Sequence, residues 1–333
     1  LQEVGSDCFL LVERFKAHES IVAMTSYQLL VRLFSEQCLV ESGDTGKTVS
    51  IKPNKEVPST SLQSPSDPDA GFSGHKGKGY QVQVMETYSP DKSQPDLITY
   101  VKVEAAHESD AQAVLPAIAD AAKRELSPSE LLADSLYGGD ENVENARKQG
   151  VEVVSPAKGD QSHAISLADF HFSESDEMLS CPMGQSPQRA KTGKNGGKIV
   201  HFDKAACDLC PRQSDCPVKR VKQSATVSYD AKALRLARRR VKEKTGAFRE
   251  AYRYRAGIEG TMSDLDRLTG IKHLRVRGMR QVRVAATLKA TGLNILRSAM
   301  FRIRKRRRHA GNSGDDSTDL AYLGLIKERF MRI

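Results

Sequence analysis

Residues 130–159, ELLADSLYGGDENVENARKQGVEVVSPAKG, decide the fold class. The apolar run 131–133 fits a buried strand, and the serine and glycines that follow it predict a turn. We expect a helix with Asp140 as its N-cap and Gly150 at its end. Residues 151–154 then form a second strand. A strand, a helix and a strand in this order predict a parallel pair within an α/β fold.

Asp134 lies at the carboxyl end of the first of these strands. Functional groups of parallel sheets gather at the carboxyl ends of the strands, which makes Asp134 a candidate site residue. An aspartate that only forms a turn would occupy the same position. The segment by itself therefore leaves a catalytic and a structural role equally open.

The segments upstream extend the α/β pattern. Residues 81–88 alternate, with Val82 and Val84 on one face, and predict a strand. Residues 97–104 predict the second strand of a hairpin, with Ile98, Tyr100 and Lys102 on one face. Residues 111–126 have the spacing of an amphipathic helix. The order hairpin, helix, strand, helix and strand suits a mixed sheet flanked by helices.

Two motifs together resemble the DDE transposases of bacterial insertion sequences. The first is Ala-Asp-x-x-Tyr at residues 133–137, followed by Glu-Asn and by Gly-Val. The second is Tyr252, Arg255 and Glu259, spaced as Tyr, two residues, Arg, three residues and Glu. The family pattern then places a Lys where this chain has Asp266, followed by Arg267. The resemblance covers residues 61–296 and implies a ribonuclease-H-like fold: a mixed sheet flanked by helices, with a helical N-terminal segment and a cysteine-rich insertion.

The resemblance implies a site of three carboxylates that hold Mg2+ or Mn2+. Asp134 would be the second aspartate and Glu259 the glutamate. Asp69, or Asp67, is the best candidate for the first aspartate within the chain. An equally open alternative is that the first aspartate lay upstream of Leu1, which would make the chain a truncated, inactive remnant. Mg2+ prefers carboxylate oxygens, and two such ions can activate the attacking oxygen and stabilise the leaving oxygen of a phosphoryl transfer.

Four cysteines lie between the two motifs, and their spacing is compatible with a metal site. They are Cys181, Cys207, Cys210 and Cys216, and the glycine-, lysine- and serine-rich segment among them has few core residues. Four thiolates close a tetrahedral structural Zn2+ site, with His201 as an alternative ligand. A disulfide pair, an iron–sulfur site and a site without metal remain alternatives. Related transposases carry a similar cysteine-bearing insertion at this place.

The positive charge is concentrated in one part of the chain. The net charge is +9, but residues 219–308 carry 27 Lys and Arg against 6 Asp and Glu. Such an asymmetry favours a polyanion, and double-stranded DNA is the expected partner because phosphate contacts supply most non-specific affinity. A solvated helix face is the alternative for such a charge run. The residues that we expect to contact DNA are Tyr252, Arg255, Arg267, Lys272, Arg275 and Arg277.

These observations divide the chain and set its expected function. The expected segments are 1–45 (helical), 46–160 (first part of the core), 161–225 (cysteine-rich insertion), 226–300 (core-completing helices with Glu259) and 301–333 (basic tail). We expect residues 302–308 to be disordered and residues 320–330 to form a short helix.

The expected function is strand cleavage and strand transfer at element ends and target DNA, by a homodimer on DNA. The alternatives are an inactive DNA-binding fragment and a metal-dependent nuclease. No run of 18 apolar residues suggests a membrane span, and a cytoplasmic, nucleoid-associated protein is expected.

Overall fold

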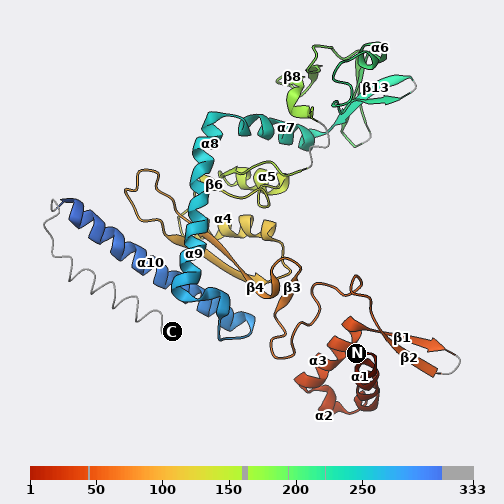
Figure 1. The fold of residues 1–333 in the computed structure, drawn as a ribbon, viewed down its shortest axis with the longest axis vertical. Coiled ribbons are helices and arrows are strands. Elements are labelled where there is room, and N and C mark those ends of the chain that lie inside the picture. Colours follow the sequence, from red (N-terminus) through yellow and green to blue (C-terminus); the bar gives the residue numbers. More distant parts are fainter. Residues whose placement is uncertain (44–45, 160–163, 194, 222, 310–333) are drawn as a thin grey trace. The chain divides into compact units, whose positions relative to one another are not determined.

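The computed structural model describes residues 1–333 except 44–45, 160–163, 194, 222 and 310–333 (Figure 1). The chain is mixed α/β and divides into two compact units. Unit 1 is made of Leu1–Asp110 and Gly257–Ile333, and unit 2 is Ala111–Ala256. The short helix expected at residues 320–330 lies outside the described residues. Asp134, Tyr252 and Arg255 belong to unit 2, whereas Asp69 and Glu259 belong to unit 1.

Unit 1 begins with helices α1 (Gln2–Phe15), α2 (Glu19–Val22) and α3 (Thr25–Gln37), within the segment 1–45 that was expected to be helical. The hairpin β1 (Cys38–Gly43) and β2 (Gly46–Ile51) follows them. The rings of Phe9 and Phe34 lie 5.8 Å apart and join α1 to α3. Gly5 of α1 is buried, and a Cβ at this position would lie 3.1 Å from the side chain of Ile51 in β2.

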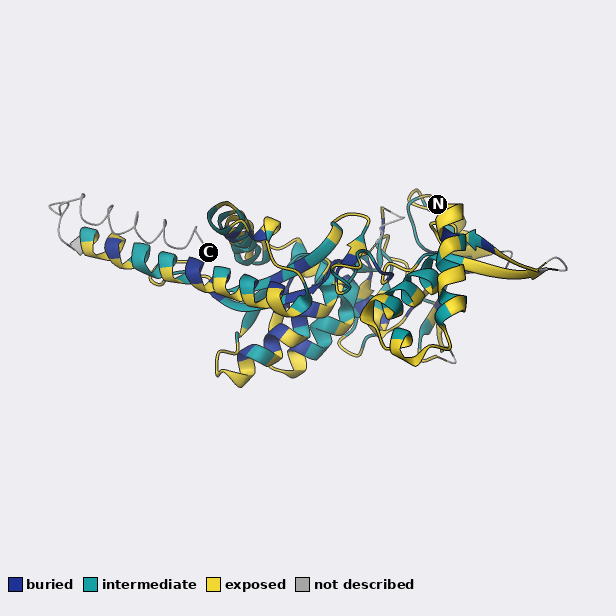
Figure 2. Cartoon of the chain, turned by 90° about the horizontal axis from the view of Figure 1, so that it is seen from below, coloured by how far each residue is buried: buried dark blue, intermediate teal, exposed yellow. Residues whose placement is uncertain are grey.

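The core of unit 1 lies between an antiparallel sheet and two helices. The sheet has the order β3 (Gly71–Ser73), β4 (Gly77–Glu86) and β5 (Ile98–Ala105). Its apolar face packs against α9 (Gly257–Thr269), the 3-10 turn η4 (Ile271–His273) and α10 (Met279–His309). Buried positions recur along α10 while its other face is exposed (Figure 2).

The hairpin was predicted correctly, but the face assigned to one strand was wrong. Ile98 is buried with Val101 and Val103, not with Tyr100 and Lys102. The pairing register shifts between Met85 and Glu86, where Tyr100 and then Ile98 are their partners. Thr99 is the extra residue of this bulge, which reverses the faces of the residues beyond it.

Unit 2 contains the parallel pair that residues 130–159 predicted. Strand β6 (Glu130–Leu132) pairs with β7 (Glu152–Val154), and α5 (Asp140–Lys148) connects them. The 3-10 turn η1 (Asp110–Ala113) leads into α4 (Val114–Lys123), which packs with α5 over this pair. Gly150 ends α5 with a φ of +76°, as expected. The N-cap of α5 is Gly139 rather than Asp140, because the Asp140 side chain binds Arg235 instead of the helix end.

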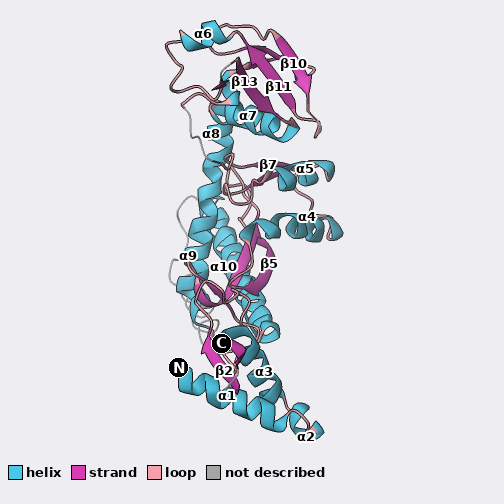
Figure 3. Cartoon of the chain, turned by 90° about the vertical axis from the view of Figure 1, so that its right-hand side faces the viewer, coloured by secondary structure: helices cyan, strands magenta, loops and turns pink. Residues whose placement is uncertain are grey.

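The cysteine-bearing part of unit 2 forms a second core of its own (Figure 3). A four-stranded antiparallel sheet has the order β10 (Arg189–Thr192), β11 (Lys198–Phe202), β13 (Ser224–Tyr229) and β12 (Lys219–Val221). The same core includes residues of the 3-10 turn η2 (Leu167–Asp169), β8 (His171–Phe172), β9 (Met178–Ser180), α6 (Lys204–Asp208) and α7 (Ala231–Glu243). Helix α8 (Gly246–Tyr252) and the 3-10 turn η3 (Arg253–Ala256) end the unit.

The expectation for the start of the basic tail was wrong within the described residues. The run of arginines at residues 302–308 belongs to α10, which continues to His309. Ile303 is buried there, and its contacts give this last part of the helix an apolar side. Arginine is also a good helix former, so a run of arginines does not by itself predict disorder.

Candidate active site

Asp134 lies just beyond the end of β6, as the sequence predicted. Ala133 extends the strand by donating its backbone N–H to the carbonyl of Val154. The chain then turns, and the Asp134 carboxylate accepts the backbone N–H of Ser135. Its other oxygen, Oδ2, lies 3.4 Å from Nη2 of Arg255. The Asp134 side chain is 43% exposed, so the carboxylate remains open to a ligand.

The turn after Asp134 is held by a buried arginine that the sequence analysis counted only as a DNA-binding charge. Arg239 of α7 donates to the carbonyl of Gly138 at 2.7 Å, and to the carbonyl and Oγ of Ser155 at 3.2 and 3.0 Å. Burial lowers the pKa of the Arg239 guanidinium. A Cβ at Gly138 would lie 1.8 Å from Oγ of Ser155, so only glycine allows this close approach.

A second arginine of α7 holds α5. Arg235 donates from Nε to Oδ1 of Asp140 at 3.0 Å and from Nη2 to Oδ2 at 2.6 Å. These hydrogen bonds hold the pKa of the Asp140 carboxyl below its usual range. Two parallel N–H···O bonds fix orientation as well as charge. Arg235 and Arg239 lie one helical turn apart on the same face of α7. This spacing is the sequence signal that could have indicated a shared structural role for the two arginines.

The second motif is divided between the two units. Tyr252 ends α8, and its ring stacks on Phe248 at 5.4 Å with an angle of 16° between the rings. Arg255 lies in η3 and reaches Asp134 within unit 2. Glu259 lies in the first turn of α9 in unit 1 and is exposed. The two predicted carboxylates, Asp134 and Glu259, therefore belong to different units.

Asp67 and Asp69 hold the start of α10. Oδ1 of Asp67 accepts the N–H of Gly278 at 3.1 Å and the hydroxyl of Tyr80. Oδ2 of Asp69 accepts the N–H of Met279 at 2.9 Å. Asp69 lies in the loop before β3 rather than on the strand that the resemblance leads one to expect. Both carboxylates satisfy donors at a helix N-terminus, where negative charge is favourable.

A family comparison covers the second motif of this site but not Asp134. Residues 180–299 match the family model described as "Transposase DDE domain". This part of the chain is similar to the DDE domain of transposases. The matched residues include all four cysteines of the insertion and the Tyr252, Arg255 and Glu259 motif. No curated protein and no solved structure is significantly similar to the chain.

DDE transposases generally use divalent metal ions, and the donor chemistry of this chain suits them. Asp134 and Glu259 offer exposed carboxylates, the oxygen ligands that Mg2+ prefers. In the described ranges, no three His, Cys, Asp or Glu side chains form a group that could hold a metal ion. Asp134 and Glu259 would hold a divalent ion through the chemistry of their carboxylates.

The four cysteines are free thiols. Cys181, Cys207 and Cys216 all pack against the core of the insertion. Burial and then the neighbouring thiols, Cys181 first among them, raise the pKa of Cys207. His201 does not join them, because it alternates with Val200 and Phe202, whose side chains point into that same core.

The predicted DNA contacts beyond Glu259 lie on exposed segments of unit 1. Arg267 pairs with Asp264 at 2.8 Å. Lys272 pairs with Asp266, the residue in place of the family's Lys, at 3.0 Å. Arg275 and Arg277 are exposed and form no ion pair with another described residue. Exposed pairs of this kind are weak, so phosphates can compete for these cations.

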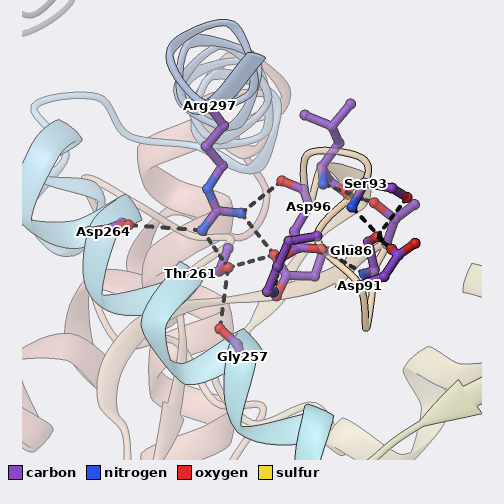
Figure 4. Close-up of polar contacts among 12 residues, drawn as sticks. Glu86, Asp91, Ser93, Asp96, Gly257, Thr261, Asp264 and Arg297 are labelled. Atoms are coloured by element: carbon purple, nitrogen blue, oxygen red, sulfur yellow. Dashed lines mark hydrogen bonds and ion pairs between the residues drawn. The ribbon is translucent and has the colours of Figure 1, made fainter. Parts of the chain in front are cut away.

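A buried polar cluster in unit 1 was missed by the sequence analysis (Figure 4). Oε2 of Glu86 accepts Oγ1 of Thr261 at 2.5 Å and Nη1 of Arg297 at 2.9 Å. Nη2 of Arg297 also donates to Oγ1 of Thr261 at 2.6 Å. The cluster ties the end of β4 to α9 and α10, two residues along α9 from Glu259. Its only sequence signal is that Thr261 and Arg297 interrupt the apolar faces of their helices.

None of the helices in the described part of the chain combines the length and apolar character that a membrane span needs.

Proposed function

We propose that the chain is a DNA transposase that cleaves DNA and joins the cut end to a target by phosphoryl transfer. The observation that carries this proposal is the contact between Asp134 and Arg255. The contact joins the carboxyl end of β6 to the motif inside the family match. An exposed carboxylate at a strand end, held beside a cation that suits phosphate, is the arrangement that phosphoryl transfer needs.

The side chains take distinct parts in this proposal. Asp134 and Glu259 would hold the divalent ion, which supplies Lewis-acid stabilisation of the transferred phosphoryl group. Arg255 lies beside Asp134 and would bind a phosphate oxygen of the DNA, since its planar guanidinium matches phosphate geometry. Tyr252 is stacked on Phe248 and would contact the same DNA backbone from a fixed position. Arg239 keeps the turn after Asp134 in place.

A ribonuclease-H-like core is part of the proposal. It is supported by the order of elements along the chain: an antiparallel sheet, a helix, a parallel pair with its connecting helix, and later a helix that bears a glutamate. The antiparallel sheet lies in unit 1 and the parallel pair in unit 2. The first aspartate is proposed as Asp69, although its carboxylate is engaged with Met279.

The test is cleavage of duplex DNA that covers the sequences flanking the gene, with Mg2+ or Mn2+ and with EDTA. The expected result is metal-dependent cleavage that falls at least about 100-fold in Asp134→Asn, since a metal-binding carboxylate is lost. Asp208→Asn removes an exposed carboxylate that pairs only with Lys204 among the described residues and is the matched control. The control is expected to cleave like the parent.

The other outcomes separate the alternatives. DNA binding without cleavage by the parent would replace the proposal with a binding protein. Cleavage by the parent without joining to a target duplex would leave a nuclease. Equal cleavage by Asp134→Asn and the parent would remove Asp134 from the site. If the parent cleaves DNA and Asp69→Asn cleaves it equally well, Asp69 is not the first aspartate.

We further propose that Cys181, Cys207, Cys210 and Cys216 hold a structural Zn2+. The support is their spacing in the sequence and the packing of three of them against one core. Purified protein is expected to contain about one zinc per chain, and a chelator is expected to lower its melting temperature. Cys207→Ser should lose the zinc, whereas Cys8→Ser, which changes a cysteine of unit 1, should keep it. Zinc-free protein with an unchanged melting temperature in chelator would exclude this site.

A further inference from the structure

The four-stranded sheet of the insertion has two chemically different faces. Val200, Phe202 and Val227 point into the core, together with Ala225 and Tyr229. Because side chains alternate along a strand, the residues between them lie on the opposite face. The pairing register shows which residues share that outer face: Arg189 lies opposite His201, His201 opposite Thr226, and Thr226 opposite Lys219.

The outer face is cationic and contains no acidic side chain. Its residues, by strand, are Arg189 and Lys191 of β10, Ile199 and His201 of β11, Ser224, Thr226 and Ser228 of β13, and Lys219 and Val221 of β12. Arg189, Lys191 and Lys219 are exposed. Their charges act together, since Arg189 and Lys191, after burial, lower the pKa of His201.

These cations differ from three other cations in the same sheet and its flanks. Arg189, Lys191 and Lys219 form no ion pair or hydrogen bond with a carboxylate of the described chain. By contrast, Lys198 pairs with Glu177, Lys204 with Asp208 and Arg212 with Asp215. The outer face thus carries positive charge that no neighbouring carboxylate in the described residues neutralises, which is the condition for attracting a polyanion.

We propose that the outer face of this sheet is a second DNA surface, which binds the phosphate backbone of a duplex through Arg189, Lys191 and Lys219. The hydroxyls of Ser224, Thr226 and Ser228 lie in the same layer and can donate to phosphate oxygens. The three cations are assigned to phosphates, which carry no sequence information directly, so the surface binds without strong sequence preference.

The dimensions of the face suit a duplex. Neighbouring strands are about 4.8 Å apart, so the cations of β10 and Lys219 of β12 are separated by about 14 Å across the sheet. The major groove is about 12 Å wide, so cations at the two edges can meet the phosphates of both backbones. Arg189 and Lys191 are two residues apart, about 7 Å along β10, and this distance spans about two phosphates of one strand.

The choice of DNA over another polyanion rests on the proposed function. The basic face itself is established independently, by the pairing register of the sheet and the exposure of its cations. The test is the affinity of the full chain for a 30-base-pair DNA duplex, measured by fluorescence anisotropy in EDTA at several salt concentrations. EDTA prevents metal-dependent cleavage, so binding is read whether or not the protein is an active transposase.

The test variant is Arg189→Gln, Lys191→Gln and Lys219→Gln. The matched control is Lys198→Gln, Lys204→Gln and Arg212→Gln, which removes the same charge from cations that already have carboxylate partners. We expect the test variant to bind about 10- to 100-fold more weakly at low salt, and its salt slope to fall by about 2 to 3, close to one per lost phosphate contact. The control should keep most of the affinity and slope.

Three results would overturn the proposal. The first is equal binding by the test and control variants, and Lys191→Glu offers a single exposed change with which to repeat the comparison if the triple variant unfolds. The second is an affinity of the parent for a duplex RNA of the same length that exceeds its affinity for DNA. The third is loss of binding without a change in salt slope. Cleavage by the parent together with any of these would leave the proposed function in place and remove only this surface.

Discussion

Gly138 shows how a single residue positions the candidate site. A Cβ there would meet Oγ of Ser155 at 1.8 Å and Nη2 of Arg239 at 2.9 Å, so the turn after Asp134 closes only around a glycine. We predict that Gly138→Ala lowers the free energy of unfolding by about 1–3 kcal/mol, the usual cost of overpacking. Gly139→Ala is the control, because nothing lies within 4 Å of a Cβ at Gly139. Urea unfolding of both variants measures the difference, and equal loss in the two would contradict the contact.

The Arg235 and Asp140 pair makes the stability of unit 2 depend on pH. The hydrogen bonds from Arg235 lower the pKa of Asp140 in the folded state, while the unfolded carboxyl titrates near 3.9. The pair therefore stabilises the fold fully above about pH 4, and this contribution is lost as the pH falls through the lowered pKa. We predict that Asp140→Asn melts below the parent at pH 6 and that the difference shrinks at pH 3. A difference that is constant with pH would show that charge is not the cause.

Sequence reasoning succeeded at the residue scale where the chemistry is local. Asp134 follows its strand directly, so a short apolar run and a turn were enough to place it. The partner of Gly138 is Arg239, 101 residues away, and nothing in the sequence near Gly138 indicates it. An arginine in a charge run looks the same whether it faces solvent or a buried carbonyl. Only the packing of α7 against the turn separates the two cases.

At the scale of elements, the cluster of Glu86, Thr261 and Arg297 joins three segments of unit 1. Glu86 and Arg297 are 10% and 19% exposed, so loss of Arg297 removes the cation that pairs with the Glu86 carboxylate. We predict that Arg297→Met lowers the free energy of unfolding by about 3 kcal/mol. We also predict that Glu86→Gln lowers this free energy less in the Arg297→Met variant than it does in the parent protein. Arg280→Met, an exposed change on the same helix, is the control. Additive effects in urea unfolding would contradict a coupled pair.

Elements were predicted best where one period dominates the sequence. In the strands around residues 81–104, apolar residues recur with a clear period of two. In the first part of α10 they recur at every third or fourth residue. The bulge beside Glu86 has no such signal, because one extra residue changes the faces without changing the composition. The same limit applies to the helix at residues 302–308, where the arginines hide the apolar side that Ile303 provides.

Over the whole molecule, the excess of basic residues overstates the charge that is available to DNA. Several cations of α7 are engaged within unit 2: Arg235 with Asp140, Arg238 with Asp176, Arg239 with Ser155, and Lys242 with Glu152. The end of α10 differs, since Arg302, Arg304, Lys305 and Arg306 are paired with no carboxylate in the described part of the chain. Position in the fold, rather than the count of basic residues, decides which cations can replace counterions on DNA.

A pair of variants with equal charge tests this difference. Changing Arg302, Arg304, Lys305 and Arg306 to Gln removes four unpaired cations, and we predict that the salt slope of DNA binding falls by about 3 to 4 with little change in melting temperature. Changing Arg235, Arg238, Arg239 and Lys242 to Gln removes the same charge from engaged side chains. That variant should instead melt at a lower temperature and keep most of its salt slope at temperatures where it is folded. A guanidinium that already binds a carboxylate or a carbonyl does not replace a counterion on DNA, so its loss does not change the salt slope. Its removal does leave that acceptor without a hydrogen-bond donor, which lowers the melting temperature. Equal loss of salt slope in the two variants would mean that total charge governs binding and that the pairing seen in α7 gives way to DNA.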